Sequence, residues 1–184
     1  RATGELRDMT VRISAPAGRG MLITFRPADK MQPMRPLAEY EQKVVRMRQR
    51  GMIYPYEIIR MLTPPQRHAR AEFPHGDFVE YDLDGHGELI RVDRPYGQNK
   101  SNIILGVIRN FTSKYPEGMA RVMLLGDPSK DLGALAESEC RRIIAAIDLA
   151  EQMGLPLEWF PISAGAKISM DSGVENMDWI ARVL

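Results

Sequence analysis

Two glycine-bearing loops carry the residues that are best suited to chemistry. The first loop is GDPSKDLGALA (residues 126–136) and the second is SAGAKISMDSG (residues 163–173). In each loop a small-residue pair, Gly133 with Ala134 and Gly165 with Ala166, offers backbone N–H groups that no bulky side chain obstructs. Two such donors aimed at one point stabilise a developing oxyanion. The spacing alone leaves two alternatives open, an oxyanion or phosphate site and a pair of ordinary turn glycines.

The elements around these loops determine whether the loops meet. Each loop follows an apolar run typical of a strand, VMLL (residues 122–125) or LEWFPI (residues 157–162), and an amphipathic helix is predicted between them over residues 137–153. A strand, a crossover helix and a second strand form a unit whose two strands are parallel. Parallel strands end at the same edge of a sheet, where ligands of open α/β sheets usually bind. The sequence therefore predicts that the two loops lie side by side.

The rest of the chain also predicts a mixed α/β fold. An Asp-Gly-His-Gly turn at residues 84–87 lies between two alternating runs and predicts a hairpin. A continuous apolar run at residues 103–108 is consistent with a strand buried on both faces, and a short helix fits it almost as well. Two further helices are expected ahead of the hairpin, and two short strands near the start of the chain. The expected strands cover residues 78–83, 88–93 and 103–108, with the two short strands within 11–26, and the expected helices cover 37–50 and 56–62.

Composition limits the classes of protein to consider. The 184 residues are 44% hydrophobic and 27% charged with a net charge of +1, which is typical of a globular domain and predicts neither nucleic acid nor a membrane as a partner. No apolar run approaches the roughly 18–20 residues of a transmembrane helix. The single cysteine, Cys140, excludes an internal disulfide and fits a reducing, cytoplasmic location. Cys140 lies on the apolar stripe expected for the long helix, so we expect a packed thiol there. The stripe consists of Cys140, Ile143, Ile144, Ile147 and Ala150.

Other reactive side chains give little sign of a site. The three histidines lack the spacing of metal ligands on a helix, so no metal site is expected. The basic run in the helix at residues 37–50 is expected to be a solvated helix face. The histidines are His68, His75 and His86, and the basic run is Arg46, Arg48 and Arg50.

Three stretches in order resemble one family. They are RPYGQNKSNIILGVIRNFTSKYPEG (residues 94–118) and the two glycine-bearing loops. Together they resemble the carboxyltransferase component of biotin-dependent acyl-CoA carboxylases, most of all the fused, eukaryotic-type acetyl-CoA carboxylase form. The family's motifs are RP-x-G-x-NK and Ser-Gly-Ala-Arg-Ile, and the latter corresponds to residues 164–168 here. MIYPYEIIRML (residues 52–62) also resembles the tyrosine-rich entry segment of that domain.

The resemblance implies a crotonase-like fold, a spiral of ββα units. Residues 36–184 would be the N-terminal portion of the carboxyltransferase domain and residues 1–35 a segment that leads into it. The chain is thus expected to be a fragment of a longer polypeptide, inactive by itself. A second carboxyltransferase domain, a homo-oligomer and the biotin carrier and biotin carboxylase parts would complete the enzyme. The biotin carboxylase would use ATP and Mg, and the reaction would serve fatty acid metabolism.

The resemblance also assigns roles to residues. A carboxyl group would move from carboxybiotin to the α-carbon of an acyl-CoA through an enolate. The N–H groups of Gly165 and Ala166, helped by those of Gly133 and Ala134, would bind the enolate oxygen, and the biotin ureido group would act as the base.

Four further residues are expected to contact CoA, namely Lys167, Lys100, Arg94 and Ser163. Lys167 occupies the position of the family's arginine, where it suits a phosphate but lacks the bidentate grip of a guanidinium. The alternative for Lys167 is an ordinary surface residue. Arg94 and Lys100 have an alternative role, in which they brace the sheet by pairing with acidic residues.

Two other functions stay open at this point. A crotonase-type hydratase or isomerase would share the oxyanion loops but needs an acid and a base, for which Glu137 and Glu139 are the acidic residues near the loops. Both are also explained by their favourable interaction with the dipole of the helix that they begin. The second alternative is a non-catalytic module that binds CoA or takes part in assembly.

Overall fold

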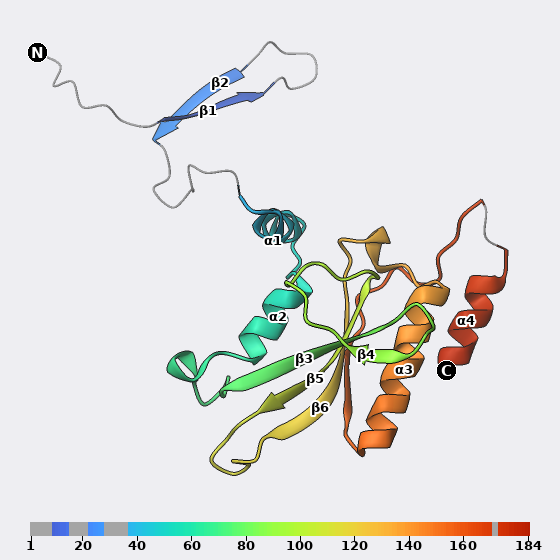
Figure 1. Cartoon of the computed structure of the whole chain (residues 1–184). Coiled ribbons are helices and arrows are strands. Elements are labelled where there is room, and N and C mark those ends of the chain that lie inside the picture. The colour runs from blue at the N-terminus through green and yellow to red at the C-terminus, as the bar shows by residue number, and fades with distance from the viewer. Residues whose placement is uncertain (1–8, 15–21, 28–36, 171–172) are drawn as a thin grey trace, which may run out of the picture. The chain divides into compact units, whose positions relative to one another are not determined.

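The computed structural model of the chain describes residues 9–14, 22–27, 37–170 and 173–184. The chain divides into two compact units, Arg1–Ala38 and Glu39–Leu184 (Figure 1). In the first unit, strands β1 (Met9–Ser14) and β2 (Leu22–Pro27) pair antiparallel. This pair confirms the prediction of two short strands within residues 11–26.

The second unit holds the candidate site and is a mixed α/β structure. The strands and helices that the sequence predicts are all present, with ends shifted by a few residues. In chain order they are α1 (Glu39–Gln49), α2 (Pro55–Leu62), β3 (Gly76–Leu83), β4 (Leu89–Arg91), β5 (Ile103–Asn110), β6 (Met119–Gly126), α3 (Glu137–Met153), β7 (Leu157–Phe160) and α4 (Glu175–Val183), with short 3-10 turns at η1 (Gln66–His68) and η2 (Asp131–Gly133).

One five-stranded sheet organises this unit, in the order β4-β3-β5-β6-β7. The pairs β4–β3, β3–β5 and β5–β6 are antiparallel. Only the last pair is parallel, because α3 carries the chain back from the end of β6 to the start of β7. The predicted parallel unit is therefore confirmed. Ile103 pairs with Gly126, so the start of β5 lies at the same edge as the end of β6.

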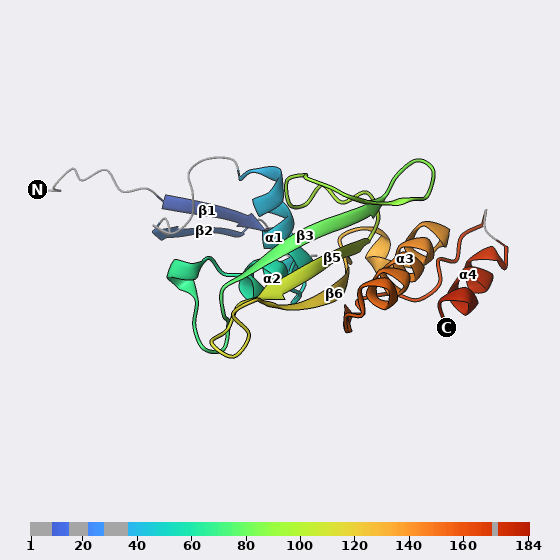
Figure 2. The ribbon, with the colours of Figure 1, turned by 60° about the horizontal axis from the view of Figure 1, so that its bottom comes forward.

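Helices cover both faces of the sheet (Figure 2). Because side chains alternate along a strand, β5 and β6 each contribute to two cores. Ile104 and Met123 pack with residues of α1 and α2 on one face, whereas Leu105 and Leu124 pack with α3 on the other. Burial on both faces explains why β5 is one continuous apolar run.

Helix α3 begins and ends where the sequence predicts. Glu137 and Glu139 occupy its first turn, and Gly154 ends it with a left-handed φ of 61°. Cys140 is fully buried, as expected for a packed thiol. The predicted apolar stripe is wrong at Ile147, which is 38% exposed, since Ala146 takes the buried position instead. No helix within the described ranges combines the length and the apolar character needed to cross a bilayer.

Candidate functional site

The loops after β6 and β7 are joined backbone to backbone. Leu135 and Ala166 form a parallel bridge. The Leu135 N–H donates to the Gly165 carbonyl at 2.8 Å, and the Lys167 N–H donates to the Leu135 carbonyl at 2.7 Å. The prediction that the two loops lie side by side is confirmed.

Close backbone packing fixes the first loop against the segment that follows β7. A Cβ added at Gly126 or at Gly133 would collide with the Ile162 carbonyl oxygen. The loop also turns left-handed over three successive residues, with φ of 45° at Asp131, 53° at Leu132 and 74° at Gly133. Two of these three are not glycine, and a left-handed conformation costs such a residue roughly 1–2 kcal/mol. The surrounding contacts must therefore hold this turn in place.

Three of the four candidate backbone donors already have acceptors. Gly133 donates to the Lys130 carbonyl at 2.8 Å and Ala134 to the Asp131 carbonyl at 2.9 Å. Gly165 donates to the Ser163 hydroxyl oxygen at 3.0 Å, so Ser163 shapes its own loop. The remaining donor is Ala166, whose N–H makes no hydrogen bond to any residue that the structure describes.

The pairing of the loops also sets the direction of this free amide. The Gly165 carbonyl and the Lys167 N–H both face Leu135. Successive backbone groups alternate along an extended segment, so the Ala166 N–H points away from Leu135. The structure thus brings the two loops together without converging their four amides. The space beside Gly165 is open, with no heavy atom within 4 Å of the position that a Cβ would take.

Lys167 forms an ion pair across the two loops. Its Nζ lies 2.9 Å from Asp131 Oδ2, and both side chains are largely exposed. The hydrogen bond and the charge of Asp131 raise the pKa of Lys167, and those of Lys167 lower the pKa of Asp131. A phosphate that contacts Lys167 would therefore share Lys167 with the Asp131 carboxylate or replace that carboxylate.

A buried asparagine pair ties the segment before β5 to the first loop. Asn99 Nδ2 donates to Asp127 Oδ2 at 2.8 Å, and Asn102 Nδ2 donates to the Ala134 carbonyl at 2.6 Å. The Asp127 N–H donates in turn to the Asn102 carbonyl at 2.6 Å. Sequence reasoning missed these positioning residues, although both asparagines flank the candidate Lys100 in QNKSN. Lys100 itself is exposed at this edge.

Arg94 lies in a network of buried charged side chains that joins β3 to α3. Its guanidinium donates to Asp82 Oδ2 at 2.6 Å and, through Nε, to Glu80 Oε1 at 2.9 Å. Arg142 of α3 donates to Asp82 Oδ1 at 2.8 Å, and Tyr56 donates to Glu80 at 3.1 Å. These contacts match the alternative in which Arg94 braces the sheet, while its contact with CoA stays a prediction.

The two carboxyls of this network have opposite pKa shifts. Burial raises the pKa of Glu80, and the hydrogen bond from Arg94 only partly opposes this rise. Burial also acts to raise the pKa of Asp82, but the hydrogen bond from Arg94 and the charges of Arg142 and Arg94 outweigh burial. The pKa of Asp82 therefore lies below its ordinary value. Asp82 is the carboxylate that holds the two arginines together.

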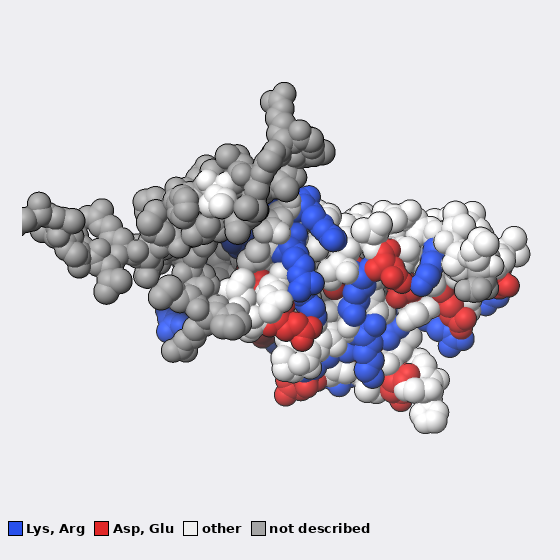
Figure 3. All heavy atoms as spheres, turned by 90° about the horizontal axis from the view of Figure 1, so that it is seen from above, with Lys and Arg blue, Asp and Glu red and all other residues white. Residues whose placement is uncertain are grey.

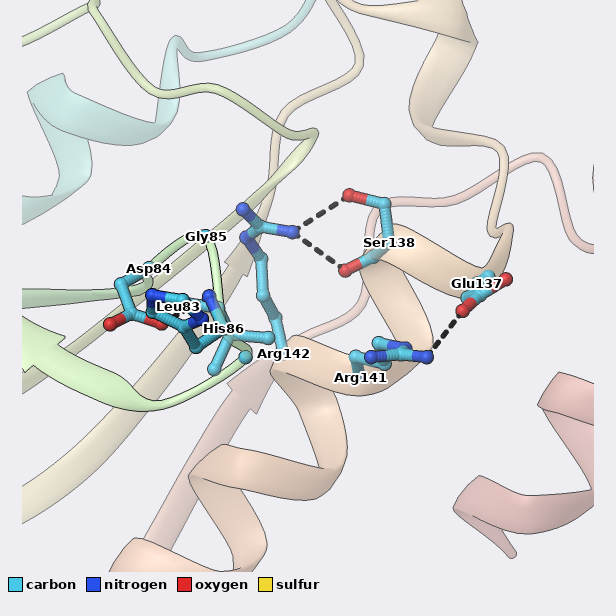
Figure 4. Close-up of a pocket in the computed structure, with 9 residues that line it drawn as sticks. Leu83, Asp84, Gly85, His86, Glu137, Ser138, Arg141 and Arg142 are labelled. Atoms are coloured by element: carbon cyan, nitrogen blue, oxygen red, sulfur yellow. Dashed lines mark hydrogen bonds and ion pairs between the residues drawn. The ribbon is translucent and has the colours of Figure 1, made fainter.

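A pocket of about 500 Å³ lies between the β3–β4 turn and the start of α3 (Figure 4). Its polar groups mostly bind one another. Arg142 Nη1 donates to the Ser138 carbonyl at 2.8 Å and to its hydroxyl at 2.7 Å. Arg141 pairs with Glu137 at 2.6 Å. His86 also lines this pocket, which the sequence did not indicate.

The carboxylates required by the hydratase alternative have structural partners. Glu137 is bound to Arg141, and the Glu139 side chain accepts the Ala136 N–H at 3.3 Å and the Asn102 N–H at 3.5 Å. Burial, followed by the charge of Glu139, raises the pKa of the neighbouring Cys140 thiol. Among the described residues, no three His, Cys, Asp or Glu side chains are grouped so as to hold a metal ion.

Comparison with known proteins gives a distant similarity to acetyl-CoA carboxylase. No family model matches the chain. The chain is 25% identical over 121 residues to acetyl-CoA carboxylase of Schizosaccharomyces pombe, an alignment that covers 63% of this chain and 5% of that protein. This chain therefore corresponds to a small part of that relative's length, and the similarity supports a distant relationship to acetyl-CoA carboxylase.

Proposed function

We propose that this chain forms part of the carboxyltransferase component of a biotin-dependent acyl-CoA carboxylase and that its sheet is the first part of a crotonase-like ββα spiral. The similarity to acetyl-CoA carboxylase supports this function, as do the three ordered motifs. The chain matches only 5% of that relative. We therefore place the second carboxyltransferase domain, the biotin carrier and the ATP- and Mg-dependent biotin carboxylase outside this chain, within an oligomer.

The free amide of Ala166 is the observation that carries the proposal. Removal of the α-proton of an acyl-CoA leaves negative charge on the thioester oxygen. A donor that is already fixed in place stabilises this charge without reorganising, and one such donor contributes about 2.7–4 kcal/mol. The bonds of Leu135 to Gly165 and Lys167 hold the amide in place, and the open space at Gly165 admits the thioester.

The open space beside Gly165 fits the acyl oxygen of the thioester. We assign no contact with biotin to this chain. Carboxybiotin, held outside this chain, would supply the carboxyl group as CO2 when its N–C bond breaks, and its freed ureido nitrogen would be the base for the α-proton. The residues of this chain would hold the thioester oxygen through Ala166. Lys167 and Lys100 would bind the phosphates of CoA, with Lys167 exchanging its Asp131 partner for a phosphate.

Replacing Ala166 with proline removes this N–H and tests the proposal. We would measure decarboxylation of malonyl-CoA and methylmalonyl-CoA by the full-length protein with its partner subunits, with and without biocytin. We expect biocytin-dependent decarboxylation that falls by about 10²–10³ in kcat in the Ala166→Pro variant. The matched control is Ala164→Pro, in the same exposed loop, which removes an amide that the proposal does not use.

A second measurement covers the case in which proline disturbs the loop. Hydrogen exchange of the unmodified protein should show that malonyl-CoA slows exchange at Ala166, because the thioester oxygen accepts its proton. Unchanged exchange at Ala166 together with normal turnover in Ala166→Pro would refute the assignment. Turnover that is independent of biocytin would instead favour a crotonase-type hydratase or isomerase, and CoA binding without turnover would favour a non-catalytic module.

A further inference from the structure

A small basic pocket lies between α1 and the turn that follows β6. Its volume is about 220 Å³. The residues that line it are Lys43, Arg46, Met47, Arg50, Ser129 and Lys130. Four of these six side chains are cationic and none is acidic. Figure 3 shows Lys and Arg side chains gathered on the face that carries α1.

Two separate segments bring these cations together. Lys43, Arg46 and Arg50 are three and four residues apart, so the helical repeat places them on one side of α1 and its end. Lys130 comes from the loop after β6, where its N–H closes a turn onto the Asp127 carbonyl at 3.2 Å. Met47 is 1% exposed and anchors α1 beneath them.

Most of this positive charge lacks an acidic partner. Lys43 pairs with Glu39 at 2.9 Å and also donates to the Gly97 carbonyl at 2.8 Å. Among the described residues, Arg46, Arg50 and Lys130 form no ion pair with a carboxylate. The pKa of Glu39 is lowered by its hydrogen bond to Lys43 and by the charges of Lys43, Arg46 and Lys130.

A favourable interaction with the helix dipole does not account for this arrangement. Basic residues near the C-terminal end of a helix are stabilised by the dipole, and this would explain Arg46 and Arg48 equally. It does not explain Lys130, which belongs to another segment and brings a further positive charge to the same place. Like charges on neighbouring helix turns repel each other, and a bound anion relieves that repulsion.

We propose that this pocket binds a phosphate group of a small-molecule ligand. Guanidinium groups bind phosphate oxygens in a bidentate manner, and lysine supplies a point charge beside them. The volume is below the roughly 300–1,000 Å³ of pockets that enclose a drug-sized ligand. The pocket therefore suits one charged group, and the rest of the ligand lies outside it.

The pocket adjoins the candidate site through two backbone contacts. Lys43 binds the carbonyl of Gly97, in the segment that leads to Lys100, and the Lys130 carbonyl accepts the Gly133 N–H at 2.8 Å. A phosphate of a CoA ester and a phosphate of a separate ligand share the chemistry that this pocket recognises. The inference does not depend on the proposed function.

The test measures the affinity of the full-length protein for inorganic diphosphate by calorimetry at fixed low ionic strength. We expect Lys130→Gln and Arg50→Gln each to weaken the binding of diphosphate by about tenfold or more, because each removes a hydrogen bond between charged groups. Arg48→Gln is the matched control, because it makes the same charge change on α1 without lining the pocket. Glu39→Gln should tighten binding, since it removes the carboxylate that competes for Lys43.

The outcomes separate the possible ligands. If Lys130→Gln weakens the binding of both CoA and diphosphate, the pocket holds a phosphate of CoA. If it weakens the binding of diphosphate alone, the pocket binds another phosphorylated ligand. Either result supports the site, even if no biocytin-dependent decarboxylation is found. Equal losses in Lys130→Gln and Arg48→Gln would show unspecific attraction and overturn the proposal, as would a failure of the unmodified protein to bind diphosphate.

Discussion

Replacing Gly133 with alanine should loosen the junction of the two loops by two separable effects. The first is the left-handed φ of 74°, which costs a residue with a Cβ roughly 1–2 kcal/mol. The second is the collision of that Cβ with the Ile162 carbonyl, for which we take the cost of overpacking, about 1–3 kcal/mol. The sum is about 2–5 kcal/mol for Gly133→Ala.

Gly51→Ala is the control that isolates the first effect. Gly51 has nearly the same φ, 75°, but no heavy atom within 4 Å of the position that a Cβ would take. We therefore expect only the conformational cost of about 1–2 kcal/mol, offset in part by the lower entropy of the unfolded chain. The difference between the two variants in the free energy of global unfolding measures the backbone contact with Ile162.

Hydrogen exchange of the full-length protein, followed by mass spectrometry, reports this local opening. The amides of Leu135 and Lys167 form the bonds that join the loops, so their exchange rates follow the free energy of opening. Every 1.4 kcal/mol is about tenfold, so Gly133→Ala should speed exchange there by at least about thirtyfold. Gly51→Ala should leave these two amides unchanged. Equal exchange in Gly133→Ala and the unmodified protein would refute the view that this contact holds the loops.

Three further predictions concern charges and the thiol. Asp82→Asn should destabilise the protein by about 3–5 kcal/mol in urea unfolding, because Arg94 and Arg142 lose a buried partner. The folded state lowers the pKa of Asp82. The contribution of Asp82 to stability is therefore present above its unfolded pKa of about 3.9 and is lost as the pH falls through the folded pKa. The free energies of unfolding of the unmodified protein and of Asp82→Asn should thus converge at low pH. Lys167→Ala should raise the Kd for CoA in calorimetry, and an unaltered Kd would contradict its role. Cys140 should react with iodoacetamide much more slowly in the folded protein than in urea, because burial raises its pKa and blocks access.

Elements with strong local signals were predictable from the sequence. Acidic residues at the start and Gly154 at the end define α3, and the Asp-Gly-His-Gly turn defines the hairpin of β3 and β4. The continuous apolar run of β5 indicates burial on both faces. In each case, residues close in the chain determine the conformation, so periodicity and turn chemistry suffice.

The state of the candidate donors could not be predicted in the same way. Whether the amides of Gly133 and Ala134 are free depends on the left-handed turn at Asp131 and Leu132, a conformation that is uncommon for residues other than glycine. Contacts between residues far apart in the sequence also cannot be predicted from local patterns, since Arg142 lies 60 positions from its partner Asp82. The basic run of α1 is typical of a solvated face when the sequence is considered alone, because nothing nearby in the chain indicates that Lys130 approaches it.

The bridge between Leu135 and Ala166 makes the length of the second loop matter as much as its composition. Backbone groups along a paired segment alternate in direction, so a shift of register by one residue exchanges the paired and unpaired amides. A single residue inserted between β7 and Gly165 would turn the Ala166 N–H toward Leu135 and present the amide of a neighbour instead. A two-residue insertion would restore the direction. Functional relatives of this chain should therefore tolerate paired insertions in this loop more readily than single ones.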